Sequence, residues 1–562
     1  TPIHDHLVTL YRSENFVFAI QFYYDQITAV FSIVGSLLFF LVATFSKYYM
    51  HRDEGFKRFF NTILLFAAGF NLIIFSGNFE TLFIGWEIKG LCSFLLIAFY
   101  RNRYLPVKNA FKTLANYRIS DVAVMLAMWM MHHLAHRNVS FSELGQIQQQ
   151  TSQAGYVGMG IFIMVMLVLA ATIKSAQFPF TTWLPRAMEG PTSSSAIFYG
   201  SLSVHVGVFL LLRTYEFWEH MPWVRISIAV IGSLTALFAT LIARVQPNVK
   251  TQIAYSSAAQ IGIMFIEIAF GLHWLALLHF AGNAFLRTYQ LLVSPSVLNY
   301  LVHHQYFHYH FTQGKPVGKF RASLYILGLK EWNLDSLMFR YLWSPFKWLG
   351  SKLQVLQAVP LLSGTFWIGS LALLVLAITR PAGWIPYQEY LGIGLGLSSL
   401  ALILFAFAHR GSALRAWVML PPAHLLLLAG ICWGSGGVRT AEIIFYAGGI
   451  LLVFLLGVYC LWVTSRIDQD IRLNRYHGYV YERPNTTLLF LLAAIGMLGF
   501  PVTTAFIGID VLFTYVKSDQ YVQIGLMALC FIFIELAAMR IFLRVYLGPH
   551  KKLYHPVAFR SS

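Results

Sequence analysis

Ten ionisable side chains stand inside long apolar stretches of this sequence. They are Glu87, Lys89, Arg118, Asp121, Lys174, His205, His279, Arg287, Asp510 and Glu535. A charge at the centre of a bilayer costs at least about 2.5–3.5 kcal/mol, so charges are kept there mainly for pairing or for a pathway. Burial can bring the pKa of Glu, Lys and His toward neutrality, which is what proton transfer between side chains requires. These residues therefore predict a cation pathway, most simply one for protons.

A purely structural explanation covers only part of this set. Arg118 and Asp121 are three residues apart, so they share one helical face and can form a buried ion pair. An arginine also keeps its charge where a lysine can lose it. Ten such residues over seven apolar segments are harder to explain by pairing alone. A path for cations remains the better prediction.

Two of the apolar segments are interrupted by proline close to an ionisable residue. Pro179 and Pro185 follow Lys174 in "IKSAQFPFTTWLPRAMEGPT", and Pro501 precedes Asp510 in "GMLGFPVTTAFIGID". Proline removes a helical hydrogen bond, and a membrane tolerates the freed backbone groups where protein or a water-filled cavity satisfies them. Broken helices in both halves of a chain point to a transport site, although each break also has the simpler reading of a kink.

The composition places these residues in a polytopic membrane protein. Of 562 residues, 57% are hydrophobic and 11% are charged, against roughly 25% charged in soluble domains. We expect an all-α fold with about fifteen transmembrane helices, two of them broken, plus a cytoplasmic amphipathic helix. The net charge of +17 lies mostly in alternate short loops, which favours membrane topology over nucleic-acid binding. That alternation predicts an outside N-terminus and a cytoplasmic C-terminus.

A long polar interruption divides the apolar segments into blocks. We expect an extracytoplasmic segment 1–26, a first helical block 27–300, a cytoplasmic amphipathic insertion 301–362, additional helices 363–470, a second block 471–548, and a cytoplasmic tail 549–562. Within the insertion, Leu334, Met338, Tyr341 and Leu342 would share one apolar helical face. A helix of this kind lies in the interface plane, either to brace the bundle or to receive a soluble partner.

The sequence offers little sign of chemistry performed by this chain alone. The four cysteines all lie in apolar runs without a C-x-x-C pair, so we expect no disulfide framework or metal finger. His132 and His136 have zinc-compatible spacing but no apparent third ligand. No phosphate loop, dinucleotide fingerprint or nucleophile elbow is present. We expect no cofactor in this chain and no enzymatic reaction by it.

Four stretches carry a family resemblance. They read "FIGWEIKGLCSFLLIAFY", "KSAQFPFTTWLPRAMEGPTSSSAI", "VKTQIAYSSAAQIGIMF" and "GMLGFPVTTAFIGID". The chain resembles the antiporter-like proton-channel subunits over roughly 16–294 and 474–548. That family includes the large NuoL-like membrane-arm subunit of respiratory complex I, the Mrp antiporter subunits, and the membrane subunit of DabA–DabB inorganic-carbon accumulation systems.

The resemblance implies roles for individual residues. The implied proton pathway contains Glu87, Arg118, Asp121, Lys174, His205, His279, Arg287 and Asp510. Glu87 matches a glutamate that pairs with the lysine of the broken helix, and Lys174 matches that lysine. His279 matches a histidine of the central relay, and Arg118 and Asp121 match a family arginine and aspartate.

Several positions depart from the family pattern. Arg287 replaces a relay lysine, and Tyr199 stands where the family has histidine, with His205 about two turns further on. Ile509 replaces the exit lysine and leaves Asp510 beside it, while Lys89 is an addition. These departures put the second half of a standard relay in question.

The layout of the chain favours the DabA–DabB type. The stretch 295–473 separates the two family-like parts, the start aligns with the family's third helix, and no long lateral helix follows the last apolar segment. The resemblance implies a proton-conducting, or alternatively sodium-conducting, subunit of the bacterial inner membrane that drives bicarbonate or CO2 accumulation. Its implied partner is a large cytoplasmic or peripheral DabA-like protein resembling a zinc β-carbonic anhydrase, which would hold the zinc. The alternatives are a subunit of a Mrp-like antiporter or energy-converting dehydrogenase or hydrogenase, and a non-conducting anchor for a soluble enzyme.

Overall fold

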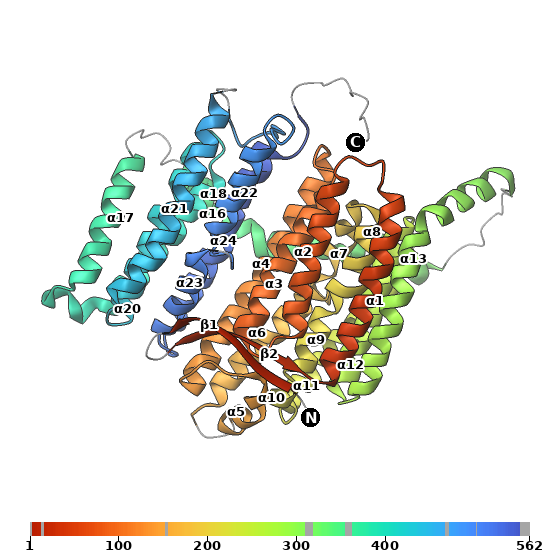
Figure 1. Ribbon diagram of the computed structural model, residues 1–562, viewed down its shortest axis with the longest axis horizontal. Helices are drawn as coiled ribbons and strands as arrows, with labels where there is room; N and C mark the ends of the chain where they lie inside the picture. The colour runs from red at the N-terminus through yellow and green to blue at the C-terminus, as the bar shows by residue number, and fades with distance from the viewer. Residues whose placement is uncertain are drawn as a thin grey trace.

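Most of the protein is helical. A computed structural model describes residues 3–12, 16–151, 155–308, 318–354, 362–466, 471–501 and 503–550; the expected tail thus falls largely outside the described residues. Figure 1 shows two groups of helices side by side, α1 to α13 in one and α17 to α24 in the other. The predicted all-α membrane fold is confirmed, with one β-hairpin that the sequence analysis did not predict.

The first group contains the N-terminal helices. They are α1 (Gln26–Tyr49), α2 (Phe56–Ile74), α3 (Phe79–Ile97), α4 (Tyr104–Ala135), η1 (Phe141–Glu143), α5 (Leu144–Thr151), α6 (Val157–Lys174), α11 (Pro222–Ala243), α12 (Val249–Ala269) and α13 (His273–His308). Between α6 and α11 the chain forms shorter elements, namely η2 (Phe180–Thr182), α7 (Trp183–Arg186), η3 (Ala187–Glu189), α8 (Thr192–Ser195), the π-helix η4 (Ala196–Leu202), η5 (Ser203–His205), α9 (Val206–Arg213) and α10 (Tyr215–Trp218).

Side-chain caps and small residues explain why these helices begin and pack where they do. The carboxylate of Asp25 accepts a hydrogen bond from Thr28 N at 2.9 Å, and Asn78 caps α3 in the same way. Helices α11 and α12 approach closely at Gly232 and Gly262, where an added Cβ would lie 2.3 and 2.6 Å from the facing glycine's carbonyl oxygen. Such close approach through small residues is typical of helix pairs in membranes.

The second group contains the C-terminal helices. They are α17 (Leu362–Thr379), η9 (Ala382–Tyr387), α18 (Gln388–Ala408), α19 (Ala413–Val418), α20 (Leu420–Gly434), α21 (Thr440–Ser465), α22 (Pro484–Gly496), α23 (Thr504–Tyr515) and α24 (Tyr521–Tyr546). Helix α24 packs against α18 and against α4 of the first group. It therefore joins the two groups.

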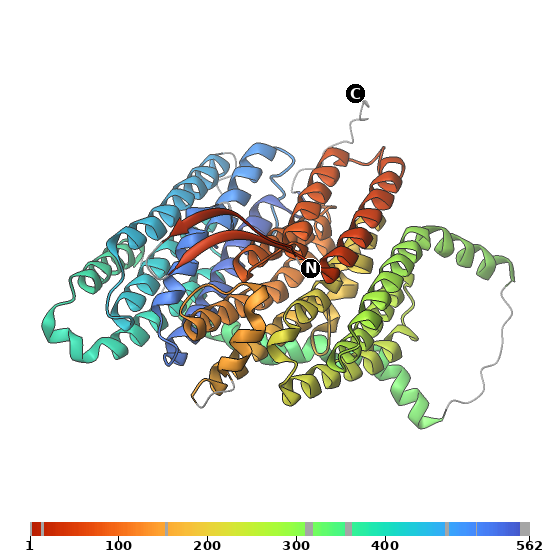
Figure 2. The same ribbon diagram turned by 60° about the horizontal axis from the view of Figure 1, so that its bottom comes forward.

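A lateral segment runs across one end of the molecule (Figure 2). It consists of α14 (Lys319–Leu329), η6 (Glu331–Asn333), α15 (Leu334–Met338), the π-helix η7 (Phe339–Trp343) and α16 (Ser344–Leu353). Helix α14 packs on α11 and α16 packs on α18, so the segment spans both helix groups. Leu334 is buried whereas Tyr341 is 72% exposed, so the residues predicted to share one apolar face do not all pack on the bundle. The wider turn of η7 rotates the residues around it relative to a regular helix.

A β-hairpin spans the two groups at the end where α3 begins. Strand β1 (Ile3–Arg12) pairs antiparallel with β2 (Val17–Tyr24). Tyr11 stacks on Phe445 of α21, with ring centroids 6.1 Å apart, and Phe18 packs edge-on against Phe506 of α23 at 5.7 Å. Asn78, at the start of α3, donates a hydrogen bond to the carbonyl of Ala19. The hairpin thus holds both groups together at the opposite end from the lateral segment.

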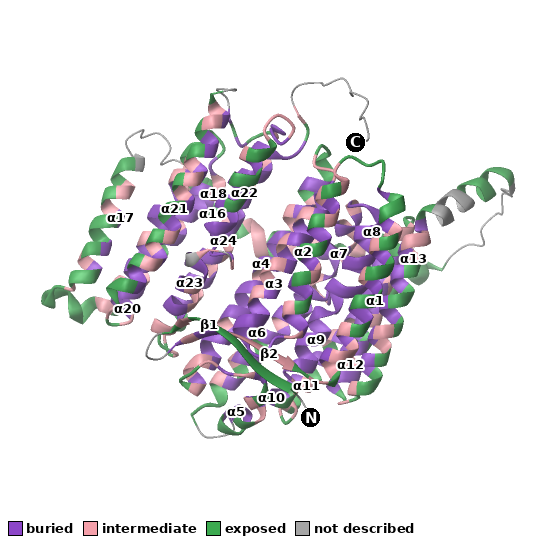
Figure 3. Ribbon diagram, viewed as in Figure 1, coloured by how far each residue is buried: buried purple, intermediate pink, exposed green. Residues whose placement is uncertain are grey.

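The exposed surface is apolar in the way a membrane requires. Among the described residues, nine helices are long and apolar enough to span a membrane by length and composition, and three shorter apolar helices run Gly364–Thr379, Pro484–Gly496 and Ala505–Tyr515. Figure 3 shows exposed residues on the outer faces of the bundle and buried ones inside it. Phe40, Ile226 and Leu278 are each more than 60% exposed on such faces, where lipid is their expected neighbour. The chain is a multi-pass membrane protein, and the count of about fifteen spans stays a prediction.

Candidate functional site

Helix α6 ends at Lys174, in the middle of the first helix group. Ala176 has a positive φ of 51°, and the chain then passes through a turn to Pro179 before η2 begins. Side chains satisfy the carbonyl groups that this break frees: Trp183 Nε1 donates to Ile173 O at 3.0 Å, and Gln177 Nε2 donates to Ser175 O at 2.9 Å. The break therefore places Lys174 at an open helix end inside the protein, where backbone groups are satisfied by protein.

Lys174 pairs with Asp121 of α4. Its ammonium nitrogen lies 2.9 Å from the Asp121 carboxylate, and the two side chains are 0% and 5% exposed. The same nitrogen lies over the rings of Tyr117 and Trp86, at 4.1 and 5.2 Å from their centroids. One carboxylate and two aromatic faces thus hold this buried cation.

Arg118 bridges two glutamates from different helices. It lies 2.8 Å from Glu87 of α3 and 2.8 Å from Glu535 of α24, and it is 2% exposed. Arg118 does not form the ion pair with Asp121 that their spacing allows. The guanidinium extends between α3 and α24, whereas Asp121 forms its ion pair with α6. The resemblance implied that Glu87 pairs with Lys174. In the structure Glu87 pairs with Arg118 instead.

These buried charges form one group, which we name the deep network: Glu87, Arg118, Asp121, Lys174 and Glu535. The deep network has one further neighbour. Lys89 is fully buried and donates a hydrogen bond from Nζ to the carbonyl of Ser203 at 3.1 Å. It lies over the same two rings as Lys174, at 5.6 Å from Trp86 and 5.9 Å from Tyr117. No carboxylate of the described residues forms an ion pair with it. Lys89 therefore lies between the deep network and the segment that contains His205.

His205 follows the π-helix η4 and begins a polar chain into α13. Its Nδ1 faces the carbonyl of Ser201, and its Nε2 lies 3.1 Å from Asn283 Nδ2. This arrangement fits a neutral imidazole that donates from Nδ1 and accepts at Nε2. Arg287 Nε donates to Asn283 Oδ1 at 3.1 Å, and Arg287 Nη1 donates to Gln290 Oε1 at 2.7 Å. Arg287 is thus joined to His205 through one amide.

His279 lies closer to the surface than His205. Its ring nitrogens lie 2.8 Å from Glu267 Oε1 and 2.8 Å from Gln260 Oε1, both on α12. Its side chain is 20% exposed. The structure brings it to α12 rather than into direct contact with His205. Glu267 was missed from the sequence, although it is a carboxylate in an apolar segment like those that were singled out.

Asp510 of α23 faces the deep network across a small cavity. The cavity, of about 10 Å³, is lined by residues that include Glu87, Arg118, Ile509 and Asp510. Asp510 Oδ2 is buried without a hydrogen-bond partner. A volume of about 10–15 Å³ is what one water molecule needs. Glu80, a second buried carboxylate that sequence reasoning missed, accepts a hydrogen bond from Asn138 at 2.7 Å nearby on α3.

A polar cavity of about 700 Å³ opens at the hairpin end of α4. Its lining includes His132, His133, His136, Glu442 and Thr514. Thr514 is one turn beyond Asp510 on α23, so the cavity approaches that carboxylate. The His132–His136 pair does not gain a metal-binding shell: no group of three or more His, Cys, Asp or Glu side chains within the described parts of the chain is placed to hold an ion.

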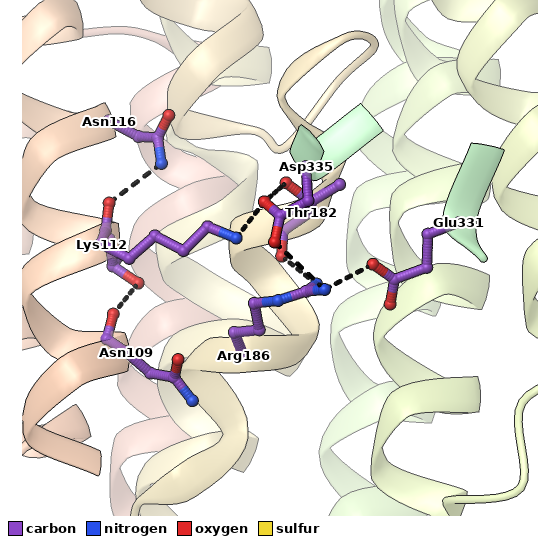
Figure 4. A network of polar contacts seen from close by, with 8 residues as sticks. Asn109, Lys112, Asn116, Thr182, Arg186, Glu331 and Asp335 are labelled. Atoms are coloured by element: carbon purple, nitrogen blue, oxygen red, sulfur yellow. Dashed lines mark hydrogen bonds and ion pairs between the residues drawn. The ribbon is translucent and has the colours of Figure 1, made fainter. Parts of the chain in front are cut away.

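A second charge network attaches the lateral segment to the broken helix (Figure 4). Asp335 pairs with Lys112 of α4 and with Arg186 of α7, and Arg186 lies 2.7 Å from Glu331. Thr182 also donates a hydrogen bond to Asp335 at 3.2 Å. We name Lys112, Arg186, Glu331 and Asp335 the latch network. Burial tends to raise the pKa of Asp335, but the hydrogen bond and charge of Lys112 and the charge of Arg186 lower it overall.

Comparisons with known proteins agree with the motifs. Residues 76–314 match the family model described as NADH:quinone oxidoreductase/Mrp antiporter, TM, and residues 11–60 match the one described as NADH-ubiquinone oxidoreductase (complex I), chain 5 N-terminus. NADH-ubiquinone oxidoreductase chain 5 of Bos indicus is 33% identical over 284 residues, 50% of this chain and 45% of that protein. The chain 5 protein of Metridium senile is 35% identical over 302 residues, 53% and 48% of the two chains.

The chain therefore spans about half the length of the curated relatives it matches. Among solved structures, the Mrp complex from Dietzia sp. DQ12-45-1b is 20% identical and covers 77% of this chain and 41% of that chain, with a TM-score of 0.49. The two family models and the chain 5 relatives support the resemblance to antiporter-like membrane subunits of the complex I and Mrp type.

Proposed function

We propose that this chain is the proton-conducting membrane subunit of a larger complex. One observation carries the proposal: ionisable side chains from α3, α4, α6 and α24 meet inside the bundle, and Lys89 connects them to the segment of His205. The deep network with Lys89 contains three acidic and three basic groups. With all six charged it is neutral, so gain or loss of one proton changes its net charge, and the neighbouring pairs can respond.

Within this proposal each residue has a definite task. Lys174, which pairs with Asp121, exchanges a proton with Lys89. The amines of the two lysines lie over the same ring, that of Tyr117. His205 accepts the proton beyond Lys89 at Nε2, the ring nitrogen that lies 3.1 Å from Asn283 Nδ2. Arg118 keeps its charge and holds Glu87 and Glu535 in position. Asp510, facing Glu87 and Arg118 across the small cavity, gives a branch toward the hairpin end.

We further propose that the proton flow drives accumulation of bicarbonate or CO2 by a DabA-like partner in a bacterial inner membrane. The motif likeness and the additional helices 363–470 support this assignment. Zinc would belong to the partner, and no residue of this chain is assigned to it. A subunit of a Mrp-like antiporter or of a complex I-type dehydrogenase is the second candidate, because the matched models and relatives are of those types. Purification of the native complex separates them: a large soluble zinc protein supports the first, and iron–sulfur proteins or several small membrane subunits support the second.

Proton flux through the complex in liposomes tests the shared part of the proposal. A pH-sensitive dye inside the vesicles reports entry of protons under an imposed membrane potential. The Lys174→Ala variant should lose the flux, while Lys47→Ala, at the end of α1 and outside the deep network, should keep it. Equal flux in Lys174→Ala and the unaltered complex would overturn the pathway. Absence of flux in the unaltered complex would instead favour a non-conducting anchor, the reading that Arg287 and Ile509 suggest.

A further inference from the structure

Two adjoining cavities lie between the lateral segment and the helices beneath it. The larger, of about 600 Å³, is lined mainly by apolar side chains, and we name it the apolar cavity; its lining includes Phe111, Phe180, Trp343, Phe407 and Phe533. The smaller, of about 330 Å³, we name the basic cavity. Lys108, Phe111, Lys347 and Phe407 line both. The two therefore form one cleft with an apolar part and a charged part.

The basic cavity collects positive charge from four parts of the chain. Its basic lining residues are Lys108 of α4, Lys347 of α16, Arg410 after α18, and Arg540 and Arg544 of α24. No acidic residue lines it. None of the five forms an ion pair with a carboxylate of the described residues, in contrast to Lys112 and Arg186 of the latch network close by. The cavity thus concentrates cationic groups without an internal counter-charge.

Arg540 has a buried donor that the protein leaves unused. Its Nη2 atom is buried and has no hydrogen-bond partner. The guanidinium instead lies over the ring of Phe407, 5.4 Å from the centroid, while Arg544 lies 4.2 Å over Tyr476. Arg540 and Arg544 are four residues apart on one helix face, where like charges destabilise each other. A guanidinium with a buried, unused donor is stabilised by an anion, which offsets the loss of hydration.

The adjoining apolar cavity indicates what kind of anion this is. A phosphate group matches the planar donors of two arginines, and Lys108 and Lys347, which line both cavities, add positive charge beside it. A free phosphate would leave the aromatic cavity beside it unfilled, whereas an acyl chain would occupy it. Basic pockets between transmembrane helices are typical sites for anionic lipid headgroups. We propose that this cleft binds one anionic phospholipid, with its phosphate in the basic cavity and part of an acyl chain in the apolar cavity.

A bound lipid of this kind would hold the lateral segment against the bundle. The apolar cavity includes Asp335 and Ser336 of the lateral segment, and the basic cavity includes Lys347 and Ser351 of α16. On the other side both cavities are lined by α4 and α24. The lipid would therefore connect the segment to the two helices that carry Arg118 and Glu535 of the deep network.

Native mass spectrometry of the complex purified from membranes tests the proposal. The complex is delipidated in mild detergent and titrated with phosphatidylglycerol or phosphatidylcholine. We expect phosphatidylglycerol to bind more tightly, and the Arg540→Gln/Arg544→Gln double variant to weaken it by about tenfold or more, because charge-assisted hydrogen bonds are lost. Arg415→Gln, an exposed basic residue of α19 outside both cavities, is the matched control and should leave binding unchanged.

Two further measurements distinguish a bound phospholipid from free inorganic phosphate. Ser336→Trp fills the apolar cavity without altering charge and should weaken phosphatidylglycerol, whereas Ser323→Trp on exposed α14 should not. Inorganic phosphate should compete poorly with the lipid. Equal binding of the two phospholipids, no effect of the double variant, or full competition by inorganic phosphate would each overturn the proposal. So would cross-linking of the cavity to an acidic segment of a partner protein in place of lipid. If the double variant does not fold, Lys108→Gln, at an exposed residue of the lining, makes the same test with a smaller expected loss.

Discussion

The deep network and the latch network both include residues of α4, and they differ mainly in burial. Four members of the deep network, Arg118, Lys174, Asp121 and Glu535, are at most 6% exposed. Three members of the latch network, Lys112, Arg186 and Asp335, are 28%, 28% and 37% exposed. The remaining member of each, Glu87 and Glu331, is 13% exposed. Only six residues, about 9 Å of helix rise, separate Lys112 from Arg118. Water screens the latch network, so its ion pairs contribute little each and can reform. In the deep network every charge depends on its neighbours.

This difference suggests that two parts of α4 have different functions. Buried pairs of Lys, Glu and Asp respond strongly to one added or lost proton, as a relay requires. Partly exposed pairs can open and close at small cost, as an attachment of a surface segment requires. The latch reaches Arg186, which lies in the interrupted helix beyond Lys174. The lateral segment and the break at Lys174 are therefore mechanically connected.

The largest effect is expected from removing the cation at the centre of the deep network. Arg118→Met leaves Glu87 and Glu535 buried without their partner. Breaking a buried ion pair in this way costs about 3–5 kcal/mol. We expect the purified complex to unfold at a much lower temperature, measured by size-exclusion chromatography after heating. Arg137→Met, whose pair with Glu143 is exposed, serves as the control. Equal thermal stability of the two variants would contradict the distinction between the networks.

The second prediction separates conduction from stability within the buried group. Lys89→Met removes an amine that pairs with no carboxylate of the described residues, so no buried acid loses its partner. The complex should assemble with nearly unchanged stability, but proton flux in liposomes should fall by about tenfold, a barrier increase of roughly 1.4 kcal/mol. A variant that unfolds like Arg118→Met, or one that conducts normally, would show that Lys89 is not a step between Lys174 and His205.

The sequence predicted the fold class and the interruptions near Lys174 and Asp510, because apolar length and proline act locally. The partners of the charges could not be predicted in the same way. Arg118 pairs with Glu535, which is distant in the sequence, and this choice depends on how α4 and α24 are rotated against each other. The β-hairpin was missed because its strands are stabilised by contacts with both helix groups, such as Tyr11 with Phe445. Asp335 lies in the segment that was predicted to form an amphipathic helix, and only the packed structure shows its carboxylate next to Lys112 and Arg186.

A smaller effect is expected from the latch network. Asp335→Asn removes the carboxylate that pairs with Lys112 and Arg186, while Arg186 keeps Glu331. Partly exposed ion pairs contribute about 0–1 kcal/mol each. We expect faster hydrogen exchange in α14 to α16 with little change in the melting temperature of the complex. Asp519→Asn, in the loop before α24, is the control. If α14 to α16 remain equally protected from hydrogen exchange in Asp335→Asn, apolar packing alone attaches the lateral segment to the bundle.

The smallest effect concerns pH and follows from the lowered pKa of Asp335. Burial opposes that shift, but Lys112 and Arg186 outweigh it. A folded pKa below the unfolded value, about 3.9 for an aspartate, means that the stabilisation is present above that pH and is lost as pH falls through the folded pKa. The lateral segment should therefore stay protected from proteolysis at neutral pH and loosen only in strongly acidic buffer, assayed with an acid-active protease. In Asp335→Asn the acid-dependent step should shrink. If the acid-dependent increase in proteolysis has the same size in Asp335→Asn, other carboxylates control the attachment of the lateral segment. The latch network would then differ from the deep network in burial but not in function.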